Sequence, residues 1–142
     1  MDKNKSLFSI PCLVLILLSW SLALANEAGE KKAMEASTYW LKLVDDNQYT
    51  KSWETAASLF KNAVSKEQWN QSLNAVRGPL GKVIKRTMKS KQYMTTLPGT
   101  PDGEYVVIQY DTSFENKVSA VETVTPMLDK DGKWRVSGYY IK

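Results

Sequence analysis

The last part of the chain, residues 103–142, alternates between apolar and polar positions in the way that half-buried β-strands do. Residues 105–114 carry an apolar or threonine side chain at every second position, and residues 118–128 and 133–141 are rich in β-branched side chains. The turn-forming residues at 101–103 and 131–132 separate these segments. The pattern therefore predicts three consecutive antiparallel strands.

The preceding segment has a helical period. Apolar side chains in residues 33–45 recur at three- and four-residue steps, and residues 50–63 repeat the pattern. Ser65 and Gln68 have the spacing of a capping box, which predicts a third helix with Trp69, Leu73 and Val76 inward, up to a break at Gly78-Pro79. We expect the tryptophans of these three helices to lie in the core. They are Trp40, Trp53 and Trp69.

A fourth strand is predicted over residues 82–94, where five basic residues fall within ten positions, 82–91. They could form an anion-binding stripe, or they could mark an edge strand that uses lysine to prevent pairing with another sheet. The absence of interleaved aromatic residues before Tyr93 favours the edge strand. The expected fold is thus α+β, with three helices packed on one face of a curved four-stranded antiparallel sheet.

The first 25 residues have the pattern of a secretory signal peptide. Lys3 and Lys5 precede an apolar run over residues 7–24, and Ala23-Leu24-Ala25 is a small-residue cleavage pattern. We expect cleavage after Ala25, which leaves a single domain over residues 26–142 in the periplasm or cell envelope. The alternative is an uncleaved anchor, because the run is about as long as the shortest membrane-spanning helices.

Composition narrows the chemistry that this domain can perform. Residues 26–142 contain no cysteine and no histidine. This excludes Ser–His and Cys–His nucleophiles and any metal site built on imidazole or thiolate, so we expect no metal, cofactor or catalytic residue. The leader removes two lysines and one aspartate, so 17 basic and 14 acidic residues remain, a net charge of +3. This mild charge predicts no nucleic-acid partner.

Several motifs together resemble a bacterial family of small exported proteins, the domain of unknown function DUF4019. They are residues 39–45 (YWLKLVD), 49–53 (YTKSW), 77–81 (RGPLG), 97–105 (LPGTPDGEY), 120–124 (AVETV) and 131–136 (DGKWRV). The resemblance implies a fold similar to the cone-shaped nuclear transport factor 2-like (cystatin-like) group. It implies no activity and no catalytic residues, because members of that group include enzymes, binding proteins and dimerisation modules.

Strand register suggests one candidate site. If Asn116-Lys117 is a two-residue turn, Asp111 lies directly opposite Glu122, and Arg135 shares their polar face away from the helices. Two neighbouring carboxylates could perform acid–base chemistry, but a solvated salt-bridge cluster is the preferred interpretation, with a cost of less than about 1 kcal/mol for Glu122→Gln. A turn one residue different in length would separate the pair.

Two arginines form a second candidate. Arg77 lies where the third helix breaks, so that its guanidinium could cap the final carbonyls of that helix. Arg86 could reach between helices and sheet and bind a carboxylate or phosphate of a ligand. Helix capping for Arg77 and solvation at the sheet edge for Arg86 are the preferred interpretations.

The same register predicts an apolar patch on the outer face of the sheet. Its members are Tyr105, Val107, Val118, Val124, Tyr139 and Ile141. Such a patch is typical of a homodimer interface or of a surface that binds a protein partner.

Three functions therefore stand as hypotheses. The first is a non-catalytic exported domain that binds a protein or a small molecule. The second is a small cone-fold enzyme that uses Asp, Glu and Tyr, although no carboxylate is expected on the helix-facing side of the sheet. The third is an envelope protein that binds anionic surfaces through residues 82–91.

Overall fold

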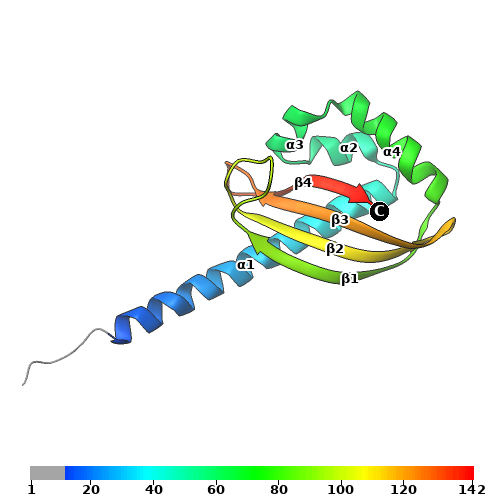
Figure 1. Ribbon diagram of the computed structural model, residues 1–142. Coiled ribbons are helices and arrows are strands. Elements are labelled where there is room, and N and C mark those ends of the chain that lie inside the picture. Colours follow the sequence, from blue (N-terminus) through cyan, green and yellow to red (C-terminus); the bar gives the residue numbers. More distant parts are fainter. Residues whose placement is uncertain (1–11) are drawn as a thin grey trace, which may run out of the picture.

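The computed structural model describes residues 12–142, with side chains described from Leu24 onward. Four helices precede four strands (Figure 1). The helices are α1 (Cys12–Asp45), α2 (Tyr49–Glu54), α3 (Ser58–Ala63) and α4 (Lys66–Leu80), and the strands are β1 (Val83–Met94), β2 (Tyr105–Phe114), β3 (Lys117–Leu128) and β4 (Trp134–Ile141).

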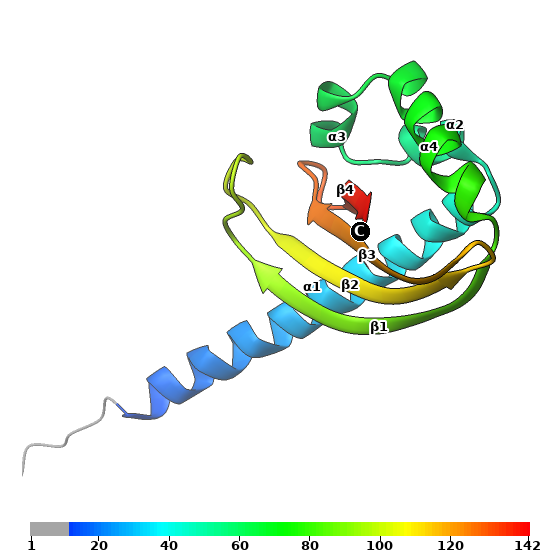
Figure 2. The ribbon, with the colours of Figure 1, turned by 45° about the vertical axis from the view of Figure 1, so that its right-hand side comes forward.

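The four strands form one antiparallel meander in the order β1-β2-β3-β4, which confirms the predicted α+β class. The sheet is curved, α1 runs behind it, and α2, α3 and α4 gather beside β4 (Figures 1 and 2). This arrangement leaves one face of the sheet covered by helices and the other directed away from them. In the sections below these are called the helix-facing side and the outer face.

The predicted helix over residues 50–63 is two short helices instead of one. The chain leaves the helical conformation at Ala57, whose backbone is extended (φ −62°, ψ 153°). Its N–H donates to the carbonyl of Val136 in β4 at 2.8 Å, so a contact with the sheet replaces a bond within the helix. Tertiary contact here overrides the local helical pattern.

The start of α4 matches its prediction. Ser65 Oγ accepts a hydrogen bond from the N–H of Gln68 at 3.2 Å, and Gln68 Oε1 accepts from the N–H of Ser65 at 3.1 Å. Both halves of the capping box are therefore present. The predicted break at Gly78-Pro79 is wrong, because the helix continues through Pro79 to Leu80 and ends at Gly81, whose φ of 76° suits glycine.

The core is centred on aromatic side chains between α1, α4 and β4. The rings of Trp40 and Trp69 lie 5.7 Å apart, and Tyr139 packs edge-on to Trp40 at 5.2 Å. Trp53 is partly buried against the same core. The indole N–H groups of the three tryptophans all find acceptors, at Ser52 O, Ser52 Oγ and Val64 O, so the expected core role of these residues is confirmed.

The first half of α1 extends beyond the sheet (Figure 1). Residues 24–28 are exposed, and from Leu24 onward the first buried side chain of the helix is that of Ala33. From Leu24 onward, where the structure describes the side chains, no helix has the length and apolar character needed to cross a bilayer. Residues 1–11 of the predicted leader lie outside the described residues, and cleavage after Ala25 stays a prediction.

Candidate functional site

The register of β2 and β3 differs from the predicted one. Glu115 and Asn116 form the turn, and Phe114 pairs with Lys117. A register shift between Thr112 and Phe114 displaces the pairing by one residue, so that Tyr110 pairs with Glu122 and Asp111 with Val121. A one-residue shift moves every side chain of a strand to the opposite face. The predicted Asp111–Glu122 pair is thus wrong, and Glu122 lies on the helix-facing side, where no carboxylate was expected.

Glu122 is fully buried there, and four hydrogen bonds occupy its carboxylate. Oε1 accepts from Arg86 Nε at 2.8 Å and from the hydroxyl of Thr112 at 2.6 Å. Oε2 accepts from the hydroxyl of Tyr139 at 2.6 Å and from a second Arg86 nitrogen at 3.2 Å. Each oxygen therefore has two donors, so the hydrogen-bonding capacity of this buried side chain is met within the protein.

Asp45, at the end of α1, completes the arrangement. Its carboxylate accepts hydrogen bonds from Arg86 at 2.7 and 3.0 Å and from Arg77 at 3.0 Å. Arg77 also donates to the hydroxyl of Tyr139 at 3.3 Å, and its guanidinium lies 4.9 Å from the centre of the Phe114 ring. We call Asp45, Arg77, Arg86, Glu122 and Tyr139 the charged cluster. It joins α1, α4, β1, β3 and β4 and has no net charge.

The two arginines therefore have neither of the preferred roles. Arg77 follows Trp69 and Leu73 at four-residue steps on the buried face of α4, and it is 5% exposed. Val76, predicted to face inward, is 47% exposed. Arg86 extends between the helices and the sheet and binds two carboxylates, those of Asp45 and Glu122. The alternative interpretation expected such binding, but of a ligand and not of the protein's own side chains.

Burial and charge shift the pKa values of Asp45 and Tyr139 in directions that preserve their interactions in the cluster. Burial raises the pKa of Asp45, but the hydrogen bonds and charges of Arg86 and Arg77 outweigh this effect and hold the pKa below its ordinary value. Burial, followed by the charge of Glu122, raises the pKa of the Tyr139 phenol. Tyr139 thus remains a hydrogen-bond donor at neutral pH.

The lowered pKa of Asp45 predicts a loss of stability in acid. A carboxyl group whose pKa is lower in the folded state contributes stability above its unfolded pKa, near 4, and loses it as pH falls through the folded value. We expect the free energy of unfolding of Asp45→Asn to fall less steeply below pH 4 than that of the wild type. Urea unfolding at pH 7, 4 and 3 would measure this, and equal slopes for the two proteins would contradict it.

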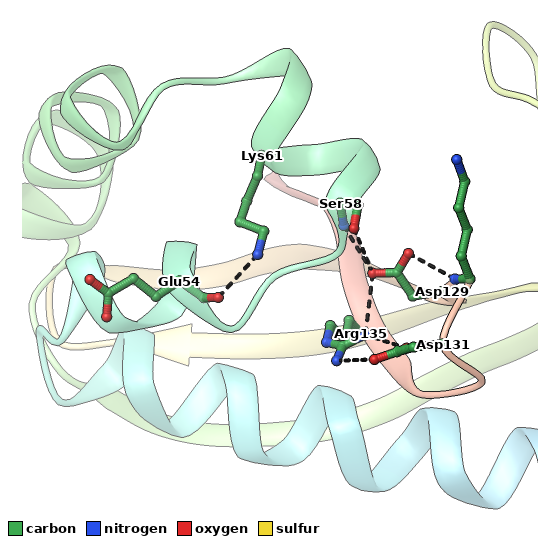
Figure 3. A pocket seen from close by; sticks show the side chains of 7 residues that line it. Glu54, Ser58, Lys61, Asp129, Asp131 and Arg135 are labelled. Atoms are coloured by element: carbon green, nitrogen blue, oxygen red, sulfur yellow. Dashed lines mark hydrogen bonds and ion pairs between the residues drawn. The ribbon is translucent and has the colours of Figure 1, made fainter.

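Asp111 and Arg135, the remaining predicted site residues, are not part of this cluster. Asp111 is exposed and lies 3.7 Å from Lys89. Arg135 lines a separate pocket of about 290 Å³ between α3 and the turn before β4 (Figure 3). There it binds both oxygens of Asp131 at 2.7 Å and reaches Asp129 at 3.3 Å, while Asp129 accepts from Ser58. The charges of Asp129, Asp131 and Arg135 are thus satisfied by their neighbours.

The basic segment 82–91 lies along β1, an edge strand of the sheet, in agreement with the preferred interpretation. Lys89 lies near Asp111, Lys91 pairs with Glu30 at 2.7 Å, and Arg86 pairs with the buried Glu122. Three of the five cations are therefore engaged by acidic groups of the chain. This weakens the basis for an anion-binding stripe.

The predicted apolar patch on the outer face is also altered by the register. Val124 is fully buried, and Tyr139 packs into the helix-facing core. Tyr105 is buried as well, because the connection over residues 95–104 folds over it and Pro101 accepts its hydroxyl at 2.6 Å. Of the six, Val107, Val118, Tyr139 and Ile141 retain exposed area. Self-association through this face stays a prediction with a weaker basis.

The outer face carries a pocket instead of a flat patch, and we call it the outer pocket. Its volume is about 340 Å³, it is open to solvent, and its lining is mainly apolar. It lies between residues 97–100 and strands β2, β3 and β4. The lining residues are Leu97, Pro98, Thr100, Tyr105, Val107, Thr123, Thr125, Ser137, Gly138, Tyr139 and Tyr140.

Sequence reasoning missed Asp45 and the outer pocket. Asp45 looked like a helix terminator because aspartate favours turns, and its role depends on arginines 32 and 41 positions away. The outer pocket depends on how residues 95–104 fold back over the sheet, which no local pattern encodes. Among residues 12–142, no group of three or more His, Cys, Asp or Glu side chains is arranged to hold a metal ion.

Comparison with known proteins places the chain in one family. Residues 36–139 match the family described as "Protein of unknown function (DUF4019)". Neither curated proteins nor solved structures gave a match. The match spans α1 from Ala36 to Tyr139 in β4, and so includes every member of the charged cluster. The chain therefore belongs to the DUF4019 family.

Proposed function

We propose that this protein is a non-catalytic binding domain of the periplasm or cell envelope and that the outer pocket is its ligand site. One observation carries the proposal. None of the eleven described residues that line the pocket is charged, although 24% of the chain is. A concave and mainly apolar surface with a few hydroxyl groups is the usual form of a small-molecule site.

The charged cluster supports a non-catalytic role. A general base needs a free lone pair near the substrate, and a general acid needs a proton that it can release. The oxygens of Glu122 already accept four hydrogen bonds, and Asp45 accepts three. The buried Glu122–Tyr139 pair is the feature that an acid–base enzyme would use, but here it joins β3 to β4, and Arg77 of α4 donates to the same tyrosine hydroxyl.

The cone-shaped, cystatin-like fold also belongs to the proposal. The curved antiparallel meander with helices on one side supports it. In such a fold the space between helices and sheet can form a ligand cavity. Here the charged cluster and the aromatic core occupy that space, which is why we assign binding to the outer face.

Gly138 offers a direct test of the site. A Cβ atom built on Gly138 would lie 3.7 Å from Cβ of Thr125, an ordinary contact. Gly138→Val should therefore fold and fill part of the pocket. We expect benzyl alcohol, indole and acetanilide at millimolar concentration to shift the amide NMR signals of Val107 and Thr123 in the wild type, and not in Gly138→Val.

The matched control is Ser119→Val, which adds the same side chain at an exposed position of β3. It should respond to the three compounds as the wild type does. Shifts that persist in Gly138→Val, or that gather around Arg135 instead, would show that the outer pocket is not the ligand site.

Export is tested separately by the mass of the mature protein. The exposure of residues 24–28 means that cleavage after Ala25 would remove no buried side chain among them. The first ion pair between α1 and the sheet, Glu30 with Lys91, lies beyond that point. We expect the intact mass of the exported protein to correspond to residues 26–142. A protein that retains Met1 would contradict this prediction.

A further inference from the structure

Thr123 has a buried hydroxyl group without a partner. The residue is 4% exposed and lines the outer pocket, and its Oγ1 makes no hydrogen bond to any residue that the structure describes. A buried hydroxyl that lacks a partner destabilises a protein, so an unpaired one calls for a physical explanation.

Other hydroxyl groups around the pocket are already engaged. Ser137 Oγ donates to the carbonyl of Thr125 at 2.8 Å, and the Tyr105 hydroxyl donates to Pro101. Thr123 therefore differs from these neighbours. Because rotation about χ1 moves the hydroxyl group of a threonine between three staggered positions, Thr123 can turn its hydroxyl toward a molecule in the pocket.

We infer that the outer pocket binds a small, uncharged and mainly apolar molecule that forms a hydrogen bond with Thr123. This inference rests on the proposed function and names the chemical class of its ligand. The volume of about 340 Å³ lies at the lower end of the range for small-molecule sites, so the ligand is about the size of one substituted ring.

The lack of charge in the lining is the basis for an uncharged ligand. An ionised group that enters an apolar site loses its hydration, and only an opposite charge or several hydrogen bonds can compensate for this. The outer pocket offers hydroxyl groups but no charged lining residue. The rings of Tyr105 and Tyr140, with Leu97, Pro98 and Val107, provide apolar contact for the body of the ligand.

Three probes of similar shape separate these contributions. 4-Propylphenol is neutral and has a hydroxyl group, propylbenzene lacks the hydroxyl group, and 4-propylbenzoate carries a negative charge. In NMR titrations of the wild type, we expect 4-propylphenol to bind at the outer pocket roughly tenfold more tightly than 4-propylbenzoate. Thr123→Val should weaken 4-propylphenol by roughly three- to tenfold and leave propylbenzene unchanged.

Thr87→Val is the matched control, because it makes the same substitution at an exposed position of β1. It should bind all three probes as the wild type does. Thr123→Val should also melt a few degrees above the wild type, since it removes an unpaired buried hydroxyl, whereas Thr87→Val should not. Thr123→Val is thus expected to be more stable than the wild type and to bind 4-propylphenol more weakly. A variant that failed to fold would not show both effects.

Each other outcome overturns the inference. Equal affinity for 4-propylbenzoate would mean that the pocket does not exclude charge, and unchanged binding of 4-propylphenol to Thr123→Val would mean that the hydroxyl does not contact the ligand. In both cases the proposed function would still hold if Gly138→Val prevented the binding of the probes. A lower melting temperature for Thr123→Val would show that the hydroxyl already has a partner in the protein. If no probe and no compound of the first panel binds, both proposals are wrong.

Discussion

Replacement of Glu122 by glutamine is expected to lower the free energy of unfolding by about 3–5 kcal/mol. The side chain is fully buried, and its carboxylate is held by Arg86, Thr112 and Tyr139. Glutamine keeps the shape but removes the charge and places an amide NH₂ group against donors. Arg86 would then remain buried with Asp45 as its only carboxylate partner, and a buried charge that loses a partner is strongly destabilising. Urea denaturation at pH 7 would measure the effect.

Asp111→Asn is the matched control, since it makes the same chemical change on the neighbouring strand at a carboxylate that is 63% exposed. Its cost should be below about 0.5 kcal/mol, because exposed ion pairs contribute little. A double variant, Glu122→Gln with Arg86→Gln, should lose less than the sum of the two single losses, since both act on the same contact. A loss below about 1 kcal/mol for Glu122→Gln would mean that this side chain is solvated.

Replacement of Trp69 by alanine is expected to cost a similar amount, about 3–5 kcal/mol. The residue is 6% exposed, and its ring contacts Phe60 edge-on at 4.9 Å and packs against Trp40 at 5.7 Å. Alanine would leave a cavity at the junction of α4 with the rest of the core. It would also remove the indole donor that binds Ser52 Oγ at 2.9 Å.

Val76→Ala provides the control on the same helix. Val76 is 47% exposed, and alanine has the higher helix propensity, so its effect should lie within about 0.5 kcal/mol of zero. Far-ultraviolet circular dichroism should follow the unfolding of both variants, because Trp69→Ala changes the fluorescence signal itself. Equal effects of the two substitutions would mean that α4 packs on a different face.

Sequence alone was sufficient for the four strands and their order, but not for the division of residues 50–63 into two helices. The four strands begin and end within one residue of their predicted positions because the two-residue period and the turn residues act locally. The capping box at Ser65 is equally local, since both hydrogen bonds lie within four residues. The burial of Trp40 and Trp69 followed from their place on amphipathic helices. Family membership likewise followed from short motifs.

The side of the sheet on which each functional residue lies was decided only by the tertiary structure. Either turn, Glu115-Asn116 or Asn116-Lys117, would by itself keep Glu122 on the face of the odd-numbered residues of β2. The register shift between Thr112 and Phe114 displaces the pairing by one residue and moves Glu122 into the core. On α4, Val76 and Arg77 both lie beside the apolar stripe of Trp69 and Leu73. Hydropathy therefore predicts that the valine is the buried one of the two. Arg77 is buried because Asp45 and Tyr139, from distant parts of the chain, provide its partners. A buried charge is stable only where such partners converge, and their convergence is a property of the assembled fold.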